Sequence, residues 1–62
     1  MNWEKVKEVF PNTWEELKKL GNETNLDGRT LLEEFCERNG IKYGLTIIKP
    51  MKDYDSKKNS SN

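Results

Sequence analysis

The sequence predicts a small α+β domain of three short helices followed by one β-strand and a disordered C-terminal tail. Apolar residues recur at helical spacing in three early segments and then alternate with a period of two after residue 40. With 62 residues, of which 32% are hydrophobic, the chain can build only one small domain with a thin core. We expect helices over residues 3–10, 13–20 and 28–39, a strand over 41–49, a domain over 1–54 and a polar tail over 55–62.

The first helix is expected between Asn2, which can cap its N-terminus, and Pro11. Trp3, Val6 and Phe10 recur at helical spacing, and charged residues occupy the positions between them. Proline disfavours helical backbone in the residue before it, so the helix should end at Phe10.

The second helix is expected to start at Thr13. Thr13 and Glu16 have the spacing of a capping box, in which each side chain accepts from a backbone N–H at the helix start. Its apolar stripe is Trp14, Leu17 and Leu20. Gly21 follows directly, and glycine is the usual residue just after a helix, so we expect this helix to end there.

The third helix is expected between Asp27, as its N-cap, and the Asn39-Gly40 pair, which tolerates left-handed backbone. Its apolar face is Leu31, Leu32, Phe35 and Cys36. Four such residues at helical spacing predict that this face of the helix is buried.

The pattern then changes to strict alternation, which predicts a half-buried strand ending at Lys49-Pro50. The inward residues are Ile41, Tyr43, Leu45 and Ile47, and the outward ones are Lys42, Gly44, Thr46 and Ile48. No other segment has comparable strand character, so the backbone groups of this strand need partners. It could form a hairpin by turning at Gly44 or Pro50, or pair with a second copy of the chain or with another protein.

The composition argues against an enzyme and against a cofactor. The chain has no histidine, which excludes Ser-His-Asp and Cys-His catalysis. Cys36 lies on the expected apolar face among glutamates, which would raise its pKa rather than activate it. The four glycines are scattered, so no phosphate-binding loop is predicted.

Residues 23–34 resemble a degraded EF-hand calcium loop over 12 of the 62 residues. The residues that carry the resemblance are Asn25, Asp27, Gly28 and Glu34. The pattern departs from the family at its first position, Glu23, and its eighth, Thr30, and no second hand is present to pair with. Calcium binding is therefore the weakest of the functions considered, and we expect no metal site.

The charge is zero overall but unevenly placed, with −3 over residues 1–40 and +3 over residues 41–62. The basic segment, with its two tyrosines, makes single-stranded nucleic acid the second candidate partner. Glutamates on the third helix would repel phosphates, and lysines also protect exposed strand edges. Nucleic acid therefore ranks behind protein as the partner.

The expected function is that of a small non-enzymatic protein-binding module, an adaptor, inhibitor or regulator. It would act through an exposed strand edge and an acidic helix face, and a second copy of the chain could be its partner through strand pairing. The expected contact residues are Lys42, Thr46, Ile48, Lys49, Tyr54, Glu33, Glu34 and Glu37. No apolar run is long enough to span a membrane, and with one cysteine and no signal-peptide pattern we expect a cytoplasmic protein.

Overall fold

A computed structural model describes residues 1–60, and over these residues the chain is helical, with no strand. The helices are α1 (Trp3–Val9), α2 (Trp14–Thr24), α3 (Gly28–Arg38) and α4 (Ile48–Ser60). The predicted α+β class is therefore wrong, because the segment expected to be a strand is a loop followed by a fourth helix. The first three helices lie where the sequence predicts them, within a few residues at each end.

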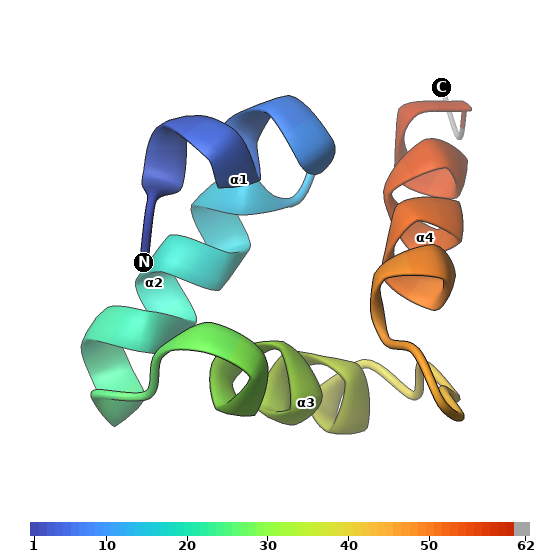
Figure 1. Cartoon of the computed structure of the whole chain (residues 1–62). Helices are drawn as coiled ribbons and strands as arrows, with labels where there is room; N and C mark the ends of the chain where they lie inside the picture. The colour runs from blue at the N-terminus through green and yellow to red at the C-terminus, as the bar shows by residue number, and fades with distance from the viewer. Residues whose placement is uncertain (61–62) are drawn as a thin grey trace.

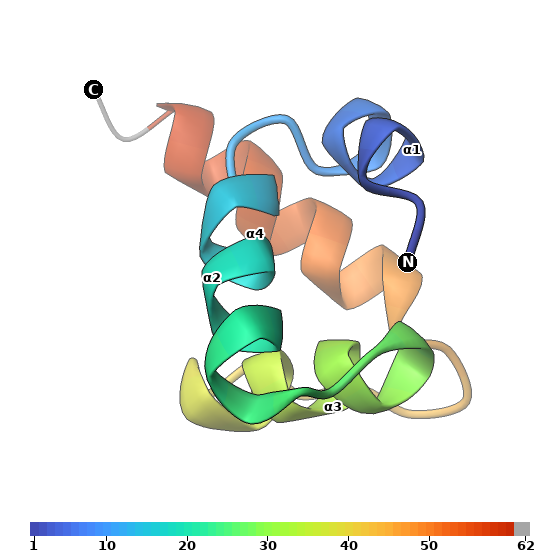
Figure 2. The same ribbon diagram turned by 90° about the vertical axis from the view of Figure 1, so that its left-hand side faces the viewer.

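Helices α2 and α4 stand on either side of α3, which crosses below both of them, while α1 lies against the upper part of α2 (Figure 1). Figure 2 shows the same molecule from the side of α2, with α4 passing behind it. The loop between α3 and α4 lies at the opposite end of the molecule from α1 in both views.

The core lies where α2, α3 and α4 converge. Its buried apolar side chains are Phe10, Leu17, Leu20, Leu31, Leu32, Phe35, Cys36, Ile47 and Met51. The apolar faces predicted for the second and third helices are largely confirmed, since Trp14 alone is only half-buried. From the expected strand, Ile47 alone is fully buried.

The predicted capping residues differ in what their side chains do. The Asn2 side chain accepts from the Lys5 N–H at 3.3 Å, as expected. Thr13 stands at the N-cap of α2, but its side chain makes no capping hydrogen bond, so the expected capping box is wrong. Its hydroxyl is instead buried without a hydrogen-bond partner, next to a turn in which the Trp14 N–H donates to the Phe10 carbonyl.

Helix α2 does not end at Gly21, as the sequence predicted, but continues to Thr24 and is capped by Asn25 at φ 59°. Gly21 sits where α3 approaches α2. A Cβ atom there would lie 3.1 Å from Leu31 Cδ2, which is closer than ordinary contact. The glycine is therefore explained by close packing rather than by helix termination.

Helix α3 has defined caps at both ends. Asp27 accepts from the Gly28 N–H at 2.8 Å, and Gly28 adopts φ +60°, which accounts for a glycine at this position. At the other end Gly40 adopts φ +67°, its N–H donates to Glu37 O, and the Ile41 N–H donates to Cys36 O. These two bonds form a Schellman motif and end the helix where the sequence predicted.

The alternating segment is a loop because only its ends reach the core. Ile41 is half-buried beside the Schellman motif and Ile47 is buried, whereas Tyr43 and Leu45 are exposed. The described chain provides no second strand, so an extended segment would have no backbone partners. Hairpin formation within residues 1–60 and the expected strand edge are therefore excluded.

Helix α4 was not predicted. Pro50 is its third residue, where a missing N–H costs nothing because the first turn has free N–H groups in any case. The expected polar tail begins at residue 55, but residues 55–60 continue α4, and residues 61–62 lie outside the described residues. Asp55 is buried and attaches α4 to the α1–α2 turn, because its carboxylate accepts from the Asn12 backbone N–H at 2.9 Å and from Asn12 Nδ2 at 3.2 Å.

Candidate functional site

The loop over residues 40–47, here called the α3–α4 loop, is held at both ends and exposed in its middle. Gly40 belongs to the Schellman motif at one end, and the buried side chain of Ile47 fixes the other. Between these anchors Leu45 is fully exposed to solvent. The exposed leucine therefore lies on a loop that is anchored to the domain at both ends, and not on a free chain terminus.

Exposed apolar side chains concentrate around this loop. Three of the four exposed large hydrophobic residues among residues 1–60 are Tyr43, Leu45 and Ile48, with Tyr43 40% and Ile48 42% exposed. In a chain with few apolar residues, such a concentration outside the core is typical of a contact surface. We call Tyr43, Leu45 and Ile48, with the neighbouring Lys42 and Lys49, the loop surface.

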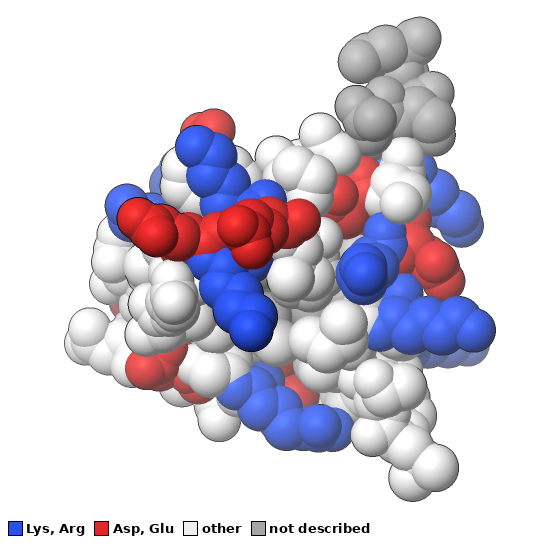
Figure 3. Space-filling view, turned by 45° about the horizontal axis from the view of Figure 1, so that its top comes forward, with Lys and Arg blue, Asp and Glu red and all other residues white. Residues whose placement is uncertain are grey.

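The loop surface is bordered by positive charge. Residues 39–52 contain three lysines and no acidic residue. Lys42, Lys49 and Lys52 are all exposed. Farther from the loop, Figure 3 shows Lys and Arg side chains mixed with Asp and Glu, both over α4 and over the opposite side of the molecule. The local field around the loop surface therefore favours an acidic partner.

Two glutamates of α3 are paired with arginines of the same helix, so this face is less acidic overall than the sequence suggested. Glu33 pairs with Arg29 at 3.1 Å and Glu34 pairs with Arg38, each one helical turn apart. Glu33 also lies near Tyr43, where partial covering of the phenol and this carboxylate raise the tyrosine pKa. The phenol of Tyr43 therefore lies beside charged groups of α3.

The predicted contact residues do not form a single group. Lys42, Thr46, Ile48 and Lys49 lie on or beside the α3–α4 loop and are exposed. Tyr54 is half-buried, with its ring at 80° to that of Phe35 and 5.8 Å from it. Glu33, Glu34 and Glu37 lie on α3.

Sequence reasoning missed Tyr43 and Leu45 as surface residues. It placed both on the buried face of the expected strand, and the structure leaves them exposed. The signal that could have identified them was the absence of a second strand, since a lone strand has no sheet on which to bury one face.

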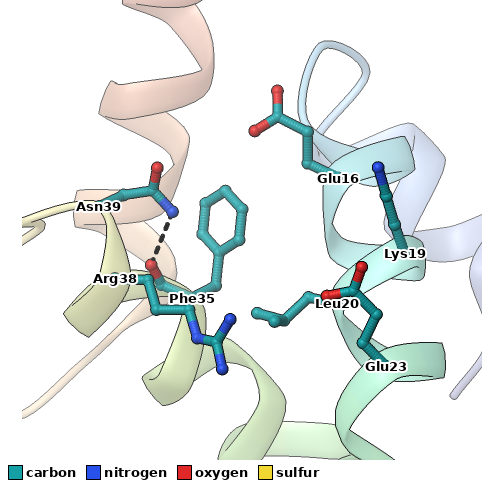
Figure 4. Close-up of a pocket in the computed structure, with 7 residues that line it drawn as sticks. All are labelled: Glu16, Lys19, Leu20, Glu23, Phe35, Arg38 and Asn39. Carbon is teal, nitrogen blue, oxygen red and sulfur yellow. Dashed lines mark hydrogen bonds between the residues drawn. The ribbon is translucent and has the colours of Figure 1, made fainter.

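A hollow of about 270 Å³ between α2 and α3 is a weaker candidate. Its lining residues are Glu16, Lys19, Leu20, Glu23, Phe35, Arg38 and Asn39 (Figure 4). Two of its charged groups already have partners, because Glu16 pairs with Lys58 and Arg38 pairs with Glu34. The lining carries equal numbers of acidic and basic residues, so it selects no particular charge.

The described residues offer neither a metal site nor an activated thiol. No group of three or more acidic, histidine or cysteine side chains that could hold a metal ion occurs among them. Gly28 is one of the four residues that carry the resemblance to a calcium loop, and its positive φ accounts for a glycine at this position. Cys36 is fully buried, and burial together with the Glu33 carboxylate raises its thiol pKa.

Comparison of the chain with protein-family models, with curated proteins and with solved structures finds no match. Within the described part of the chain, no helix has both the length and the apolar character needed to cross a lipid bilayer.

Proposed function

We propose that this chain is a small non-enzymatic protein-binding module that docks through the loop surface. Its partner is a different protein that offers an apolar socket with an acidic rim. The observation that carries this proposal is Leu45, which is fully exposed on a loop anchored at both ends. Buried in a socket, a leucine side chain contributes roughly 1.5–3 kcal/mol relative to its exposed state.

The exposure of Leu45 favours binding, and so does the anchoring of the loop that carries it. A segment whose ends are already fixed loses less conformational entropy on association than a free chain. Ile41 and Ile47 supply this fixation from within the fold. Three apolar side chains in six residues form a small contact, which suits a transient interface better than an obligate one.

The charges around the loop surface favour a different protein over a second copy of the chain. Two copies meeting through this surface would bring Lys42 and Lys49 of each copy close to the same two lysines of the other. Like charges facing each other across an interface are unfavourable, whereas an acidic partner would associate faster.

Nucleic acid is the second candidate, supported by Lys49, Lys52 and Lys57, which are exposed on α4. Phosphate contacts alone would leave the exposure of Leu45 unexplained. The two candidates differ in their salt dependence, because phosphate contacts weaken steeply as ionic strength rises.

A cytoplasmic location is part of the proposal. It is supported by Cys36, the one cysteine of the chain, which is buried and free.

Panning a library of random linear peptides against the immobilised chain tests the docking surface. We expect selected peptides to combine leucine or aromatic residues with aspartate or glutamate. Leu45→Ser should abolish their binding at unchanged stability, because a fully exposed side chain adds little to folding. Glu8→Ser is the matched control, since Glu8 is exposed on α1 at the opposite end of the molecule (Figure 1).

Two results would contradict the docking surface. Selected peptides that bind the Leu45→Ser variant as tightly as the unaltered chain would place binding elsewhere. Tight binding of a single-stranded DNA oligonucleotide that disappears with added salt, with no peptide selected, would favour the nucleic-acid function instead.

A further inference from the structure

The chain has two tyrosines, and the fold places them in different surroundings. Tyr54 is half-buried on α4, where its ring packs edge-on against Phe35 and its hydroxyl donates to Asn39 Oδ1 at 3.4 Å. Tyr43 lies on the α3–α4 loop, and its side chain is 40% exposed. A modifying enzyme can therefore reach the phenol of Tyr43 without disturbing the core, whereas modification of Tyr54 would disturb its contact with Phe35.

The backbone around Tyr43 can adapt to the active site of such an enzyme at little cost. Residues 42–46 are all exposed, belong to no helix and make no backbone–backbone hydrogen bond within the described part of the chain. Segments with exposed backbone and few internal contacts change conformation at the lowest free energy. The loop is anchored by Gly40 and Ile47, so its middle can move while α3 and α4 stay in place.

A phosphate on Tyr43 would cancel the positive charge of the loop surface. That surface carries two charged side chains, Lys42 and Lys49, and both are exposed lysines. A phosphate monoester on tyrosine adds roughly −1.5 to −2 charges at neutral pH. The two lysine charges would then be nearly balanced, and the attraction for an acidic partner would be lost.

The neighbouring groups of α3 would not neutralise this phosphate. Glu33, Glu37 and Arg29 lie close enough to act on the Tyr43 phenol. Arg29 already pairs with Glu33 at 3.1 Å, and the Glu37 carboxylate would repel a phosphate. A phosphate here would therefore compete with an acidic partner for the lysines of the loop surface.

We infer that Tyr43 is a phosphoryl-acceptor site and that its phosphorylation weakens docking on the loop surface. The donor is a nucleoside triphosphate bound to a protein-tyrosine kinase. The Tyr43 hydroxyl oxygen forms a bond to the γ-phosphorus, and the bond between that phosphorus and its bridging oxygen breaks. The phenolic proton passes to a base of the kinase, and nucleoside diphosphate leaves. This inference rests on the proposed function and adds the regulation of the same surface.

Incubation of the full chain with a broad-specificity tyrosine-kinase domain, magnesium and ATP tests the acceptor site. We expect one phosphate per chain, which peptide mass spectrometry should place on Tyr43. Tyr54→Phe is the matched control and should take up phosphate as fast as the unaltered chain, whereas Tyr43→Phe should take up almost none. Phosphate on neither tyrosine, or on Tyr54 at least as fast as on Tyr43, would overturn the inference.

The effect of the phosphate on docking is measured with the peptides selected from the random library. At low salt the phosphorylated chain should bind them at least about fivefold more weakly, because two exposed ion pairs are weakened and a repulsive charge is added. At about 1 M salt, where the Debye length is about 3 Å, this difference should largely disappear. A loss of equal size at both salt concentrations would overturn the role of charge.

Two variants of the unphosphorylated chain repeat this comparison. Tyr43→Glu should weaken peptide binding about two- to fivefold more than Tyr43→Gln, which has nearly the same size without the charge. Equal effects of the two variants would contradict the inference. Unchanged affinity of the phosphorylated chain, with Leu45→Ser still abolishing peptide binding, would retain the docking surface and remove its regulation. Failure of the docking surface itself is measured separately, by Leu45→Ser in the unphosphorylated chain.

Discussion

The surroundings that the fold gives to a side chain shift its pKa, and Cys36 and Asp27 are shifted for opposite reasons. Cys36 lies in the core, and burial raises its pKa, followed in effect by the Glu33 carboxylate. Asp27 is exposed at the start of α3, and the nearby N-terminal ammonium group and the Gly28 N–H lower its pKa. One group is thus suppressed by burial and the other is held in its charged form by hydrogen bonds.

Cys36 should react with iodoacetamide only when the domain opens. The thiol is fully buried and its thiolate is disfavoured, so alkylation of the native chain should be much slower than in denaturant. An opening free energy of about 3 kcal/mol would slow the reaction roughly a hundredfold. Mass spectrometry of the alkylated fraction over time gives both rates, and equal rates would contradict burial of Cys36.

Asp27 should make stability depend on pH at the acid end. Because the folded pKa lies below the unfolded value near 3.9, its contribution is fully present above about pH 5 and is lost as pH falls through the folded pKa. Asp27→Asn should therefore lower the melting temperature at pH 6, and the difference from the unaltered chain should shrink as pH falls through the folded pKa. A difference that persists unchanged at low pH would show that the charge of Asp27 is not responsible.

At the scale of elements, the ends of α3 and the attachment of α4 determine the arrangement of the loop surface. The Schellman motif at Gly40 directs the chain out of α3, and Ile47 returns it to the core before α4 begins. Asp55 then connects α4 to the α1–α2 turn through Asn12. Single substitutions at Gly40 and Asp55 test two of these features separately.

Gly40→Ala should destabilise the domain by about 1–2 kcal/mol, because alanine is strained at φ +67°. Gly44→Ala is the matched control within the same loop, since Gly44 has no positive φ and a Cβ there would meet no atom within 4 Å. It should leave stability unchanged or slightly raised. Chemical denaturation of both variants measures the difference, and equal losses would contradict the left-handed conformation at Gly40.

Asp55→Ala should destabilise the domain by about 1–3 kcal/mol, because it removes the acceptor for the Asn12 N–H and side-chain amide. Asp53→Ala, on the exposed side of the same helix, should change stability by less than about 0.5 kcal/mol. Urea denaturation gives both values. If the two variants lost the same stability, Asp55 would not be the residue that attaches α4.

For the whole molecule, the sequence predicts the first three helices and fails over residues 41–60, where tertiary context decides. The first three helices follow from apolar spacing, and Asn2, Asp27 and Gly40 act at the ends where they were expected. The alternation over residues 41–48 predicted a strand, but alternation stabilises a strand only if a neighbouring strand supplies hydrogen bonds. None is present among residues 1–60, so the pattern has no structural effect there.

The wrong strand prediction also changed which residues were expected in the candidate site. A strand would have buried Leu45 and exposed a backbone edge, whereas the loop exposes Leu45 itself. Lys42, Ile48 and Lys49 were correctly expected at the surface, because charge and position place them there in either fold. Helix α4 could not be recognised from its weak apolar periodicity, since Met51 is its one fully buried apolar side chain.

The exposure of Leu45 on an α3–α4 loop is the claim on which both proposals depend, and methyl NOE spectroscopy of the full chain measures it most directly. We predict helical NOEs through α4 and no long-range NOE from the Leu45 methyl groups to the core, with Ile47 in contact with it as an internal control. NOEs from Leu45 to Phe35 or Met51, or cross-strand NOEs within residues 41–49, would contradict the exposed loop.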